Sequence, residues 1–302
     1  MKYVIITVDT EGDNLWAWKD GERITTENVK YIPRFQEICE TYGYYPTYLT
    51  NYEMMMDDRW VSYGREKQKQ GLCEIGMHLH AWNTPPIIPL ENRFGGNSYI
   101  TEYSKEVIEK KVKTMAEGLA KRFECDVVSN RSGRWAINDH YLQIIRDYGI
   151  KVDCSVTPGL DLSKIPGCSK NCGNDYSKYK QESFEIIDGL LEVPMTTMVT
   201  RFPASGTAQQ RLKTLIKGES LWLRPIIDNK KLKYLSQKQL QNCDFVEFMI
   251  HSSELMPGGS PYFPNSESVE QLYKRIESLF RFYSGMGMKG VTLTNYLKLK
   301  EK

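Results

Sequence analysis

Short apolar runs alternate along the chain with longer segments in which apolar residues recur at helical spacing. The first run, residues 3–9 (YVIITVD), is rich in β-branched side chains and predicts a strand buried on both faces. By the same criteria we expect strands at 46–50, 73–80, near 126–130, 151–155, 245–250 and 290–294, and helices at 26–41, 57–70, 101–123, 137–148 and 266–284. Because strands and helices alternate, the pattern indicates βαβ units and a parallel sheet.

This alternation breaks in the middle of the chain. Residues 156–184 are rich in Gly, Pro, Ser, Lys and Asn and show no period, and looser helices are predicted near 207–217 and 236–242. One barrel-like α/β domain over residues 1–302, with an insertion around 156–235, explains this pattern better than two domains. An open doubly wound sheet is the alternative, but no glycine-rich phosphate loop opens a helix.

Composition excludes several classes of protein. The 302 residues carry 40 basic and 38 acidic side chains, so a net charge of +2 gives no attraction to nucleic acid or to an anionic membrane. The seven cysteines are scattered, and Cys168 and Cys172 have no second pair nearby, so we expect neither a disulfide framework nor a structural zinc site. No signal peptide and no membrane-spanning run is recognisable, and we therefore expect a cytoplasmic protein.

Three of the four histidines fall at predicted strand ends, where an α/β barrel gathers its functional groups. His78 and His80 are two residues apart, so their side chains leave the same face of a strand, roughly 6.6 Å apart at Cα. Two such imidazoles can bind one metal ion at about 2.0–2.1 Å. His251 follows the apolar run 245–250 and is a candidate third ligand or proton donor. His140 lies in a predicted helix and receives no role.

Carboxylates follow the first strand. Asp9 and Glu11 repeat the two-residue spacing, and Asp13 comes next, so each is a candidate metal ligand. Asp9 should be partly buried and in need of a partner. Arg131, at the end of the fourth strand, is the candidate, because its guanidinium would keep the carboxylate ionised and oriented. The alternative for Arg131 is an ordinary surface salt bridge.

Taken in order, these residues resemble the motifs of the polysaccharide deacetylase family, the NodB-homology carbohydrate esterases. The segments that carry the resemblance are 7–11 (TVDTE), 76–82 (GMHLHAW), 131–135 (RSGRW), 153–155 (DCS) and 248–251 (FMIH). The resemblance spans residues 3–294 and implies a deformed (β/α)7-type barrel. It also implies an enzyme that uses a divalent metal, usually zinc, to remove acetyl groups from N-acetylated sugars.

Two positions depart from the family pattern. Thr10 stands where the family has a metal-binding aspartate, and Trp82 stands where it has the second histidine of a His-x3-His motif. The sequence is similar to a divergent branch encoded with cell-surface polysaccharide biosynthesis, such as that of O-antigen or capsule. In this branch Glu11 would join His78 and His80 as metal ligands, with Asp9 and Asp13 as alternatives for the carboxylate.

The resemblance also implies the remaining roles. Asp9 would be the general base, Arg131 would orient it, and His251 would protonate the departing amine. Backbone N–H groups near 133–135 would hold the oxyanion. Candidate sugar-stacking residues are Trp82, Trp135 and Tyr262. A basic stretch in the insertion, formed by Arg201, Arg211, Lys213, Lys217 and Arg224, is either a phosphate site for a carrier-linked sugar or, more simply, a solvated helix face.

Three other functions remain open. A metal-independent amidohydrolase acting on a small cyclic amide would need no ligand set. An inactive carbohydrate-binding homologue would need neither the base Asp9 nor the acid His251. A glycosidase would use two carboxylates but would leave His78 and His80 without a function.

Overall fold

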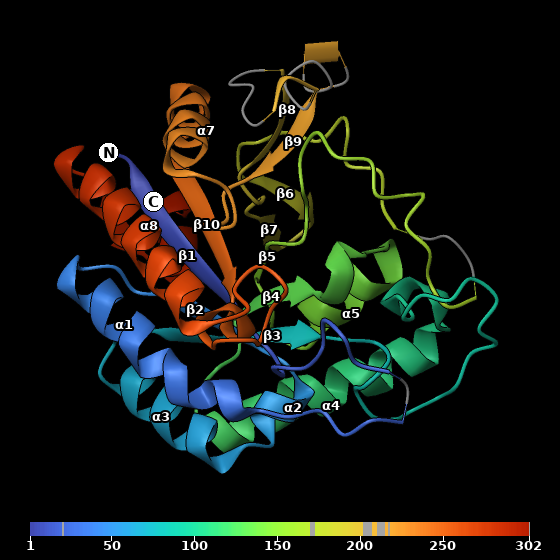
Figure 1. Cartoon of the computed structure of the whole chain (residues 1–302). Coiled ribbons are helices and arrows are strands. Elements are labelled where there is room, and N and C mark those ends of the chain that lie inside the picture. Colours follow the sequence, from blue (N-terminus) through green and yellow to red (C-terminus); the bar gives the residue numbers. More distant parts are fainter. Residues whose placement is uncertain (20, 170–172, 202–206, 210–214, 217, 302) are drawn as a thin grey trace.

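The computed structural model shows a curled sheet surrounded by helices (Figure 1) and describes residues 1–301 except 20, 170–172, 202–206, 210–214 and 217. In the described part of the chain, seven strands form a continuous path of parallel pairs: β1 (Tyr3–Thr10), β2 (Thr47–Thr50), β3 (Glu74–Leu79), β4 (Ser129–Ser132), β5 (Val152–Asp153), β7 (Leu190–Glu192) and β10 (Phe245–His251). Their spatial order is β10-β1-β2-β3-β4-β5-β7. The order follows the chain, without the reversal that defines a doubly wound sheet.

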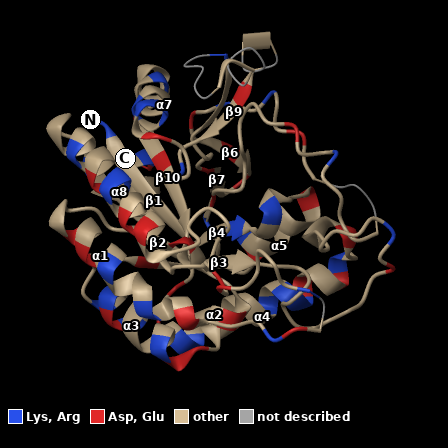
Figure 2. Ribbon diagram, in the orientation of Figure 1, with Lys and Arg blue, Asp and Glu red and all other residues tan. Residues whose placement is uncertain are grey.

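Helices cover the outside of this sheet. The α-helices are α1 (Ile32–Thr41), α2 (Tyr52–Met55), α3 (Asp58–Lys69), α4 (Lys105–Phe123), α5 (Asp139–Asp147), α7 (Asn229–Asn242), α8 (Ser266–Gly285) and α9 (Leu293–Lys300). Short 3-10 turns are η1 (Glu27–Tyr31), η2 (Ile100–Glu102), η3 (Gly133–Trp135) and η4 (Ser252–Leu255). Figure 2 shows basic and acidic residues mixed along the outer helices, as the near-neutral composition predicts.

Strand β1 pairs with three other strands of the sheet. Seven of its eight residues are buried, as its apolar composition predicts. It pairs along its whole length with β10, and Asp9 lies in register with His251. On its other side, the first half of β1 pairs with β11 (Lys289–Val291) and the second half with β2. Figure 1 shows β1 and β10 side by side, although they come from opposite ends of the chain.

The gap between β7 and β10 is bridged by segments outside the strands. The main-chain N–H of Leu223 donates to the carbonyl of Thr196 at 2.9 Å, and the N–H of Met249 donates to the carbonyl of Leu223 at 3.1 Å. The hydroxyl of Thr196 accepts a further bond from the N–H of Glu247 at 2.9 Å. A curled sheet completed in this irregular way confirms the expected deformed (β/α)7-type barrel.

The predicted insertion, residues 156–235, is wrong in one respect: it contains a strand of the main sheet. Strand β7, a member of the main sheet, lies inside the expected insertion 156–235, where it forms a hairpin with the antiparallel strand β6 (Phe184–Ile187). Because β7 is only three residues long and no helix lies between β5 and β7 in the described residues, the alternation of strand and helix gives no sign of it. A second hairpin, β8 (Thr197–Thr200) with β9 (Glu219–Trp222), forms a separate two-stranded sheet.

Several predicted boundaries also shift. The helix expected at 26–41 begins as the 3-10 turn η1, and α1 starts at Ile32, which places Pro33 in the first turn where proline is tolerated. The last strand ends at Val291, and α9 follows it instead of a strand to 294. Most of the helix predicted near 207–217 lies outside the described residues.

Gly76 in β3 gives a test of the packing between β2, β3 and β4. A Cβ atom there would lie 2.8 Å from Cδ2 of Leu49 and 3.0 Å from the carbonyl oxygen of Ser129, and would also meet the Ser129 hydroxyl. We expect Gly76→Ala to lower the free energy of unfolding by about 1–3 kcal/mol through overpacking, measured by urea unfolding. Gly285→Ala, with nothing within 4 Å of its added Cβ, is the control. Equal stability of Gly76→Ala and the wild type would contradict the packing.

Candidate active site

The carboxyl ends of β1, β3, β4 and β10 meet at one cavity of about 510 Å³. Its lining combines titratable side chains with a set of aromatic rings: Asp9, Glu11, Leu15, Trp16, His78, His80, Trp82, Asn97, Arg134, Trp135, Trp222, Arg224, Ile226, His251 and Tyr262. A volume of this size is typical of small-molecule sites. The predicted histidines and first-strand carboxylates Asp9 and Glu11 therefore do share one cavity.

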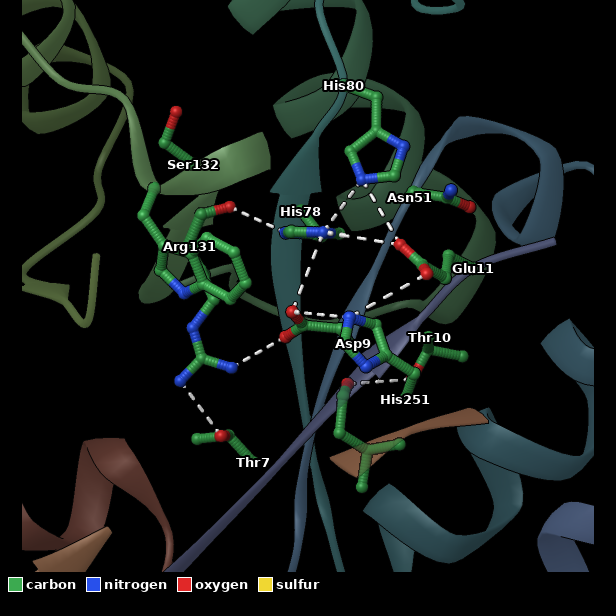
Figure 3. A network of polar contacts seen from close by, with 12 residues as sticks. Thr7, Asp9, Thr10, Glu11, Asn51, His78, His80, Arg131, Ser132 and His251 are labelled. Atoms are coloured by element: carbon green, nitrogen blue, oxygen red, sulfur yellow. Dashed lines mark hydrogen bonds and ion pairs between the residues drawn. The ribbon is translucent and has the colours of Figure 1, made fainter. Parts of the chain in front are cut away.

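Glu11, His78 and His80 form a buried group in which one ligand atom of each lies within 4.8 Å of the others. Nε2 of His80 lies 3.2 Å from Oε2 of Glu11 and 2.9 Å from Nε2 of His78. Nε2 of His78 lies 3.7 Å from the same carboxylate oxygen. Figure 3 shows the three side chains converging from β3 and from the residue after β1.

The hydrogen bonds of the two imidazoles suit a metal ion. Nδ1 of His78 donates to the main-chain carbonyl of Arg131 at 2.8 Å, so its Nε2 presents a lone pair to Glu11. Nδ1 of His80 is buried and has no hydrogen-bond partner among the described residues. Two nitrogens and a carboxylate oxygen are the donor types of a zinc site with an open position. These residues fit the metal that the resemblance implies.

The Glu11 backbone is fixed by two neighbouring segments. Its N–H donates to the hydroxyl of Ser252 at 3.0 Å, and its carbonyl accepts from Nδ2 of Asn28 at 2.8 Å. Asp13 is outside the Glu11–His78–His80 group, because its carboxylate accepts from the hydroxyl of Thr25 and from the N–H of Asn28. The hydroxyl of Thr10 donates to the carbonyl of Val8, at 3.0 Å.

Asp9 is held by Arg131, as predicted, and the alternative of a surface salt bridge is wrong. Nη1 of Arg131 donates to Oδ1 of Asp9 at 2.6 Å, and Nη2 donates to Glu247 at 2.5 Å and to the Thr7 hydroxyl at 2.9 Å. Arg131 and Glu247 are both 0% exposed. Oδ2 of Asp9 lies on the cavity side, 3.8 Å from Nε2 of His78 (Figure 3).

The charges of the site stabilise its carboxylates in the ionised form. Burial raises the pKa of Asp9, but Arg131, His78 and His251 outweigh it, and the net shift is downward. Burial likewise raises the pKa of Glu11, and the three imidazoles hold it well below its ordinary value. Burial lowers the pKa of His78, but the carboxylates of Asp9 and Glu11 raise it overall. An ionised carboxylate is the form that binds a metal or accepts a proton.

His251 faces the same carboxylates from β10. Its Nε2 lies 3.9 Å from Oδ2 of Asp9 and 3.9 Å from Oε1 of Glu11. Its Nδ1 lies 2.9 Å from Nη2 of Arg224, and its main-chain N–H donates to Oε2 of Glu254 at 2.9 Å. The structure therefore places Arg224 and Glu254 against His251. The sequence analysis named Arg224 only in the basic stretch and gave Glu254 no role.

Aromatic rings form the walls of the cavity. The predicted residues Trp82, Trp135 and Tyr262 all line it. Trp82 stacks on His80 with ring centroids 4.3 Å apart and also lines the cavity. Two further tryptophans were missed. Trp222 lies against Trp135 at 4.9 Å, and Trp16 meets Tyr262 edge-on at 5.6 Å.

A strained turn aims Trp135 into the cavity. Arg134 and Trp135 have φ values of 57° and 56°, a region that bulky residues rarely adopt. The insertion holds this turn: the hydroxyl of Tyr176 donates to the carbonyl of Trp135 at 2.5 Å, and Asn174 bonds both main-chain groups of Ile137. Non-glycine residues in this conformation persist where their surroundings fix them, commonly at functional sites.

Only Arg201 and Arg224 of the basic stretch lie among the described residues, and for Arg224 the expected solvated helix face is wrong. Arg224 is buried in the cavity wall because it pairs with Glu254, whereas Arg201 is exposed. Arg211, Lys213 and Lys217 lie outside the described residues, as does Cys172. The remaining six cysteines form no disulfide. No helix in the described part is long and apolar enough to cross a membrane.

Comparisons with known proteins identify the fold. No protein-family model matches the chain, and no curated protein matches it. Among solved structures, 4-alpha-glucanotransferase from Thermococcus litoralis is similar with a TM-score of 0.58 and 12% identity, over 98% of this chain and 40% of that one. A GH57 branching enzyme from Thermococcus kodakaraensis is similar with a TM-score of 0.54 and 10% identity, over 98% and 71%. A putative polysaccharide deacetylase from Mycobacterium smegmatis is similar at 13% identity and a TM-score of 0.48, over 97% and 94%.

Asp153, from the fourth motif, does not line the cavity. It lies in register with Glu192 on β7, and both side chains are 0% exposed. Burial, together with the Asp153 carboxylate, raises the pKa of Glu192 well above its ordinary value. A carboxyl whose pKa is higher in the folded than in the unfolded chain makes its full contribution to stability below the unfolded-state pKa, about 4.3. That contribution is lost as the pH rises toward the folded-state pKa.

Glu192→Gln should remove the loss of stability that ionisation of Glu192 causes at higher pH. The amide can still accept from the N–H of Val156 and can donate to Asp153. We expect the variant to gain stability over the wild type progressively above about pH 4.3, in urea unfolding at a series of pH values. Glu185→Gln, on the exposed side of β6, is the matched control. A stability difference that stays constant with pH would contradict this assignment.

Gly133 allows His80 to reach its position. A Cβ atom on residue 133 would lie 2.6 Å from Cδ2 of His80 and 2.6 Å from the carbonyl oxygen of Leu79. We expect Gly133→Ala to displace His80 and to weaken zinc binding by about 10–100-fold, in competition with a chromophoric chelator. Gly285→Ala should bind as the wild type does. Unchanged affinity in a folded Gly133→Ala protein would show that His80 does not bind the ion.

Proposed function

We propose that the chain is a metal-dependent hydrolase that removes an N-acetyl group from a sugar in cell-surface polysaccharide metabolism, such as that of O-antigen or capsule. One observation carries the proposal: the buried Glu11–His78–His80 group shares its cavity with a carboxylate, Asp9, that a buried arginine orients. A divalent metal such as zinc, held by this group, supplies a Lewis acid and lowers the pKa of bound water.

Asp9 is the general base of this proposal. Its Oδ1 is bound to Arg131, which leaves Oδ2 toward the cavity to accept a proton from the attacking water. The Arg131 guanidinium keeps the carboxylate ionised and prevents its rotation, because Arg131 is itself bound to Thr7 and Glu247. A base must be both ionised and within reach of the proton it removes.

His251 acts on the leaving group. Its Nε2 faces the same space as Oδ2 of Asp9, 3.9 Å away, from the neighbouring strand. From this position Nε2 donates a hydrogen bond to the departing nitrogen while the C–N bond breaks. Water contributes a hydroxyl to the acetyl carbon and a proton to Asp9, Asp9 passes that proton to the departing nitrogen, and the products are acetate and an amino sugar.

The aromatic walls support a sugar substrate. Trp135 and Trp222 on one side, and Trp16 and Tyr262 on another, offer flat apolar faces that can pack against a pyranose ring. A glycosyl-transferring enzyme, as the two fold relatives of higher TM-score are named, would use two carboxylates across a sugar bond. Here Glu11 is engaged by two imidazoles and Asp9 by Arg131, which favours the hydrolase.

Acetate release tests the function. We expect the wild type to release acetate from N-acetylated oligosaccharides or nucleotide-linked N-acetyl sugars, and to lose this activity with a chelator. Asp9→Asn should lower kcat by about 10²–10⁴-fold, since it removes the general base. Asp58→Asn, whose carboxylate is exposed, should leave activity unchanged.

Other outcomes separate the alternatives. Acetate release that is insensitive to a chelator would support a metal-independent amidohydrolase. Glycan binding without acetate release would support an inactive homologue. Cleavage of the glycan chain would support a glycosidase. Each of these three results would overturn the proposed function.

A further inference from the structure

The environment of the His251 ring determines which of its nitrogens carries a hydrogen. Nη2 of Arg224 lies 2.9 Å from Nδ1 of His251 and 2.9 Å from Oε1 of Glu254. A guanidinium can only donate hydrogen bonds, so Nδ1 must accept. An imidazole that accepts at Nδ1 carries its hydrogen on Nε2.

We infer that Arg224 is a positioning residue that fixes the hydrogen of His251 on Nε2, the nitrogen that faces Asp9 and Glu11. Nε2 lies 3.9 Å from a carboxylate oxygen of each. If the hydrogen were on Nδ1 instead, it would point at the guanidinium, and the site would face a lone pair where it needs a donor. Only the use of this hydrogen, as a hydrogen bond to the leaving nitrogen, rests on the proposed function.

Glu254 makes the arrangement rigid. Its side chain is 0% exposed, and it pairs with Arg224, whose buried charge would otherwise be costly. Its second oxygen accepts from the main-chain N–H of His251, so the pair holds both the ring and the backbone of the histidine. Trp16 packs edge-on against the ring, with centroids 5.2 Å apart.

The insertion therefore supplies part of the proposed machinery. Arg224 lies two residues after the end of β9, and that strand ends in Trp222, which lines the cavity. The main chain at Leu223 is bound to Met249 of β10, two residues before His251. This hydrogen bond between Leu223 and Met249 holds the backbone next to Arg224 against β10, within reach of the His251 ring.

Nuclear magnetic resonance of protein labelled with ¹⁵N-histidine tests the inference without any substrate. Two-bond ¹⁵N–¹H correlations distinguish a protonated ring nitrogen from a bare one, and the chain has only four histidines. The exposed His140 provides an internal reference. For metal-free wild type we expect the hydrogen of His251 on Nε2. A hydrogen on Nδ1 would overturn the inference.

Variants then test the role of Arg224. Arg224→Gln combined with Glu254→Gln removes the guanidinium without leaving an unpaired buried charge. We expect a mixture of His251 tautomers and a fall in kcat of at least about 10²-fold, with little change in KM. Arg224→Lys, whose ammonium also only donates, should keep the Nε2 tautomer and recover part of kcat. Arg201→Gln, on the exposed surface, is the control.

The outcomes distinguish this inference from the proposed function. A double variant with a pure Nε2 tautomer and wild-type kcat would overturn the positioning role. If the double variant does not fold, Arg224→Lys still decides, because a Nδ1 tautomer in that protein would overturn the inference. If wild type releases no acetate but shows the Nε2 tautomer, the proposed function fails and the positioning of His251 stands.

Discussion

Arg131 carries a permanent positive charge into the interior of the barrel, where its side chain has no contact with solvent. A buried charge is tolerated only when ionic and hydrogen-bonding partners compensate for its lost hydration. Strand β4 is separated from β1 by β2 and β3, so the guanidinium crosses the interior to reach Asp9 and Glu247. Its own carbonyl meanwhile sets the tautomer of His78. One residue therefore orients both a carboxylate and a histidine of the cavity.

The features that the sequence predicted depend on local geometry. His78 and His80 project to the same side because they are two residues apart at the end of β3, where side chains alternate whatever surrounds the strand. Asp9 follows an apolar run and needed a cationic partner, and Arg131 occupied a strand end at the same edge of the sheet. The parallel sheet followed from the alternation of strands and helices. In each case the inference required only spacing, burial and the known edge at which parallel strands end.

The features that were missed depend on contacts between irregular segments. Arg224 reaches His251 from a stretch without period, so no spacing in the sequence connects the two. Trp222 belongs to a four-residue strand whose partner is another short strand, and Trp16 lies in the loop after β1. Neither position has a sequence pattern that distinguishes a cavity wall from ordinary packing. Strand β7 was hidden because a hairpin, and not a helix, leads into it.

The pairing of β1 with β10 has a consequence for how the chain is made. Strand β1 is an apolar strand that is synthesised long before its partners β10 and β11. At 5–20 residues per second, β1 waits about 10–50 s for β10 to emerge from the ribosome. During that interval one edge of a nascent apolar strand is unpaired and prone to association with other chains. Asp9 meets His251 only when this edge closes, so the cavity cannot be completed before β10 has been made.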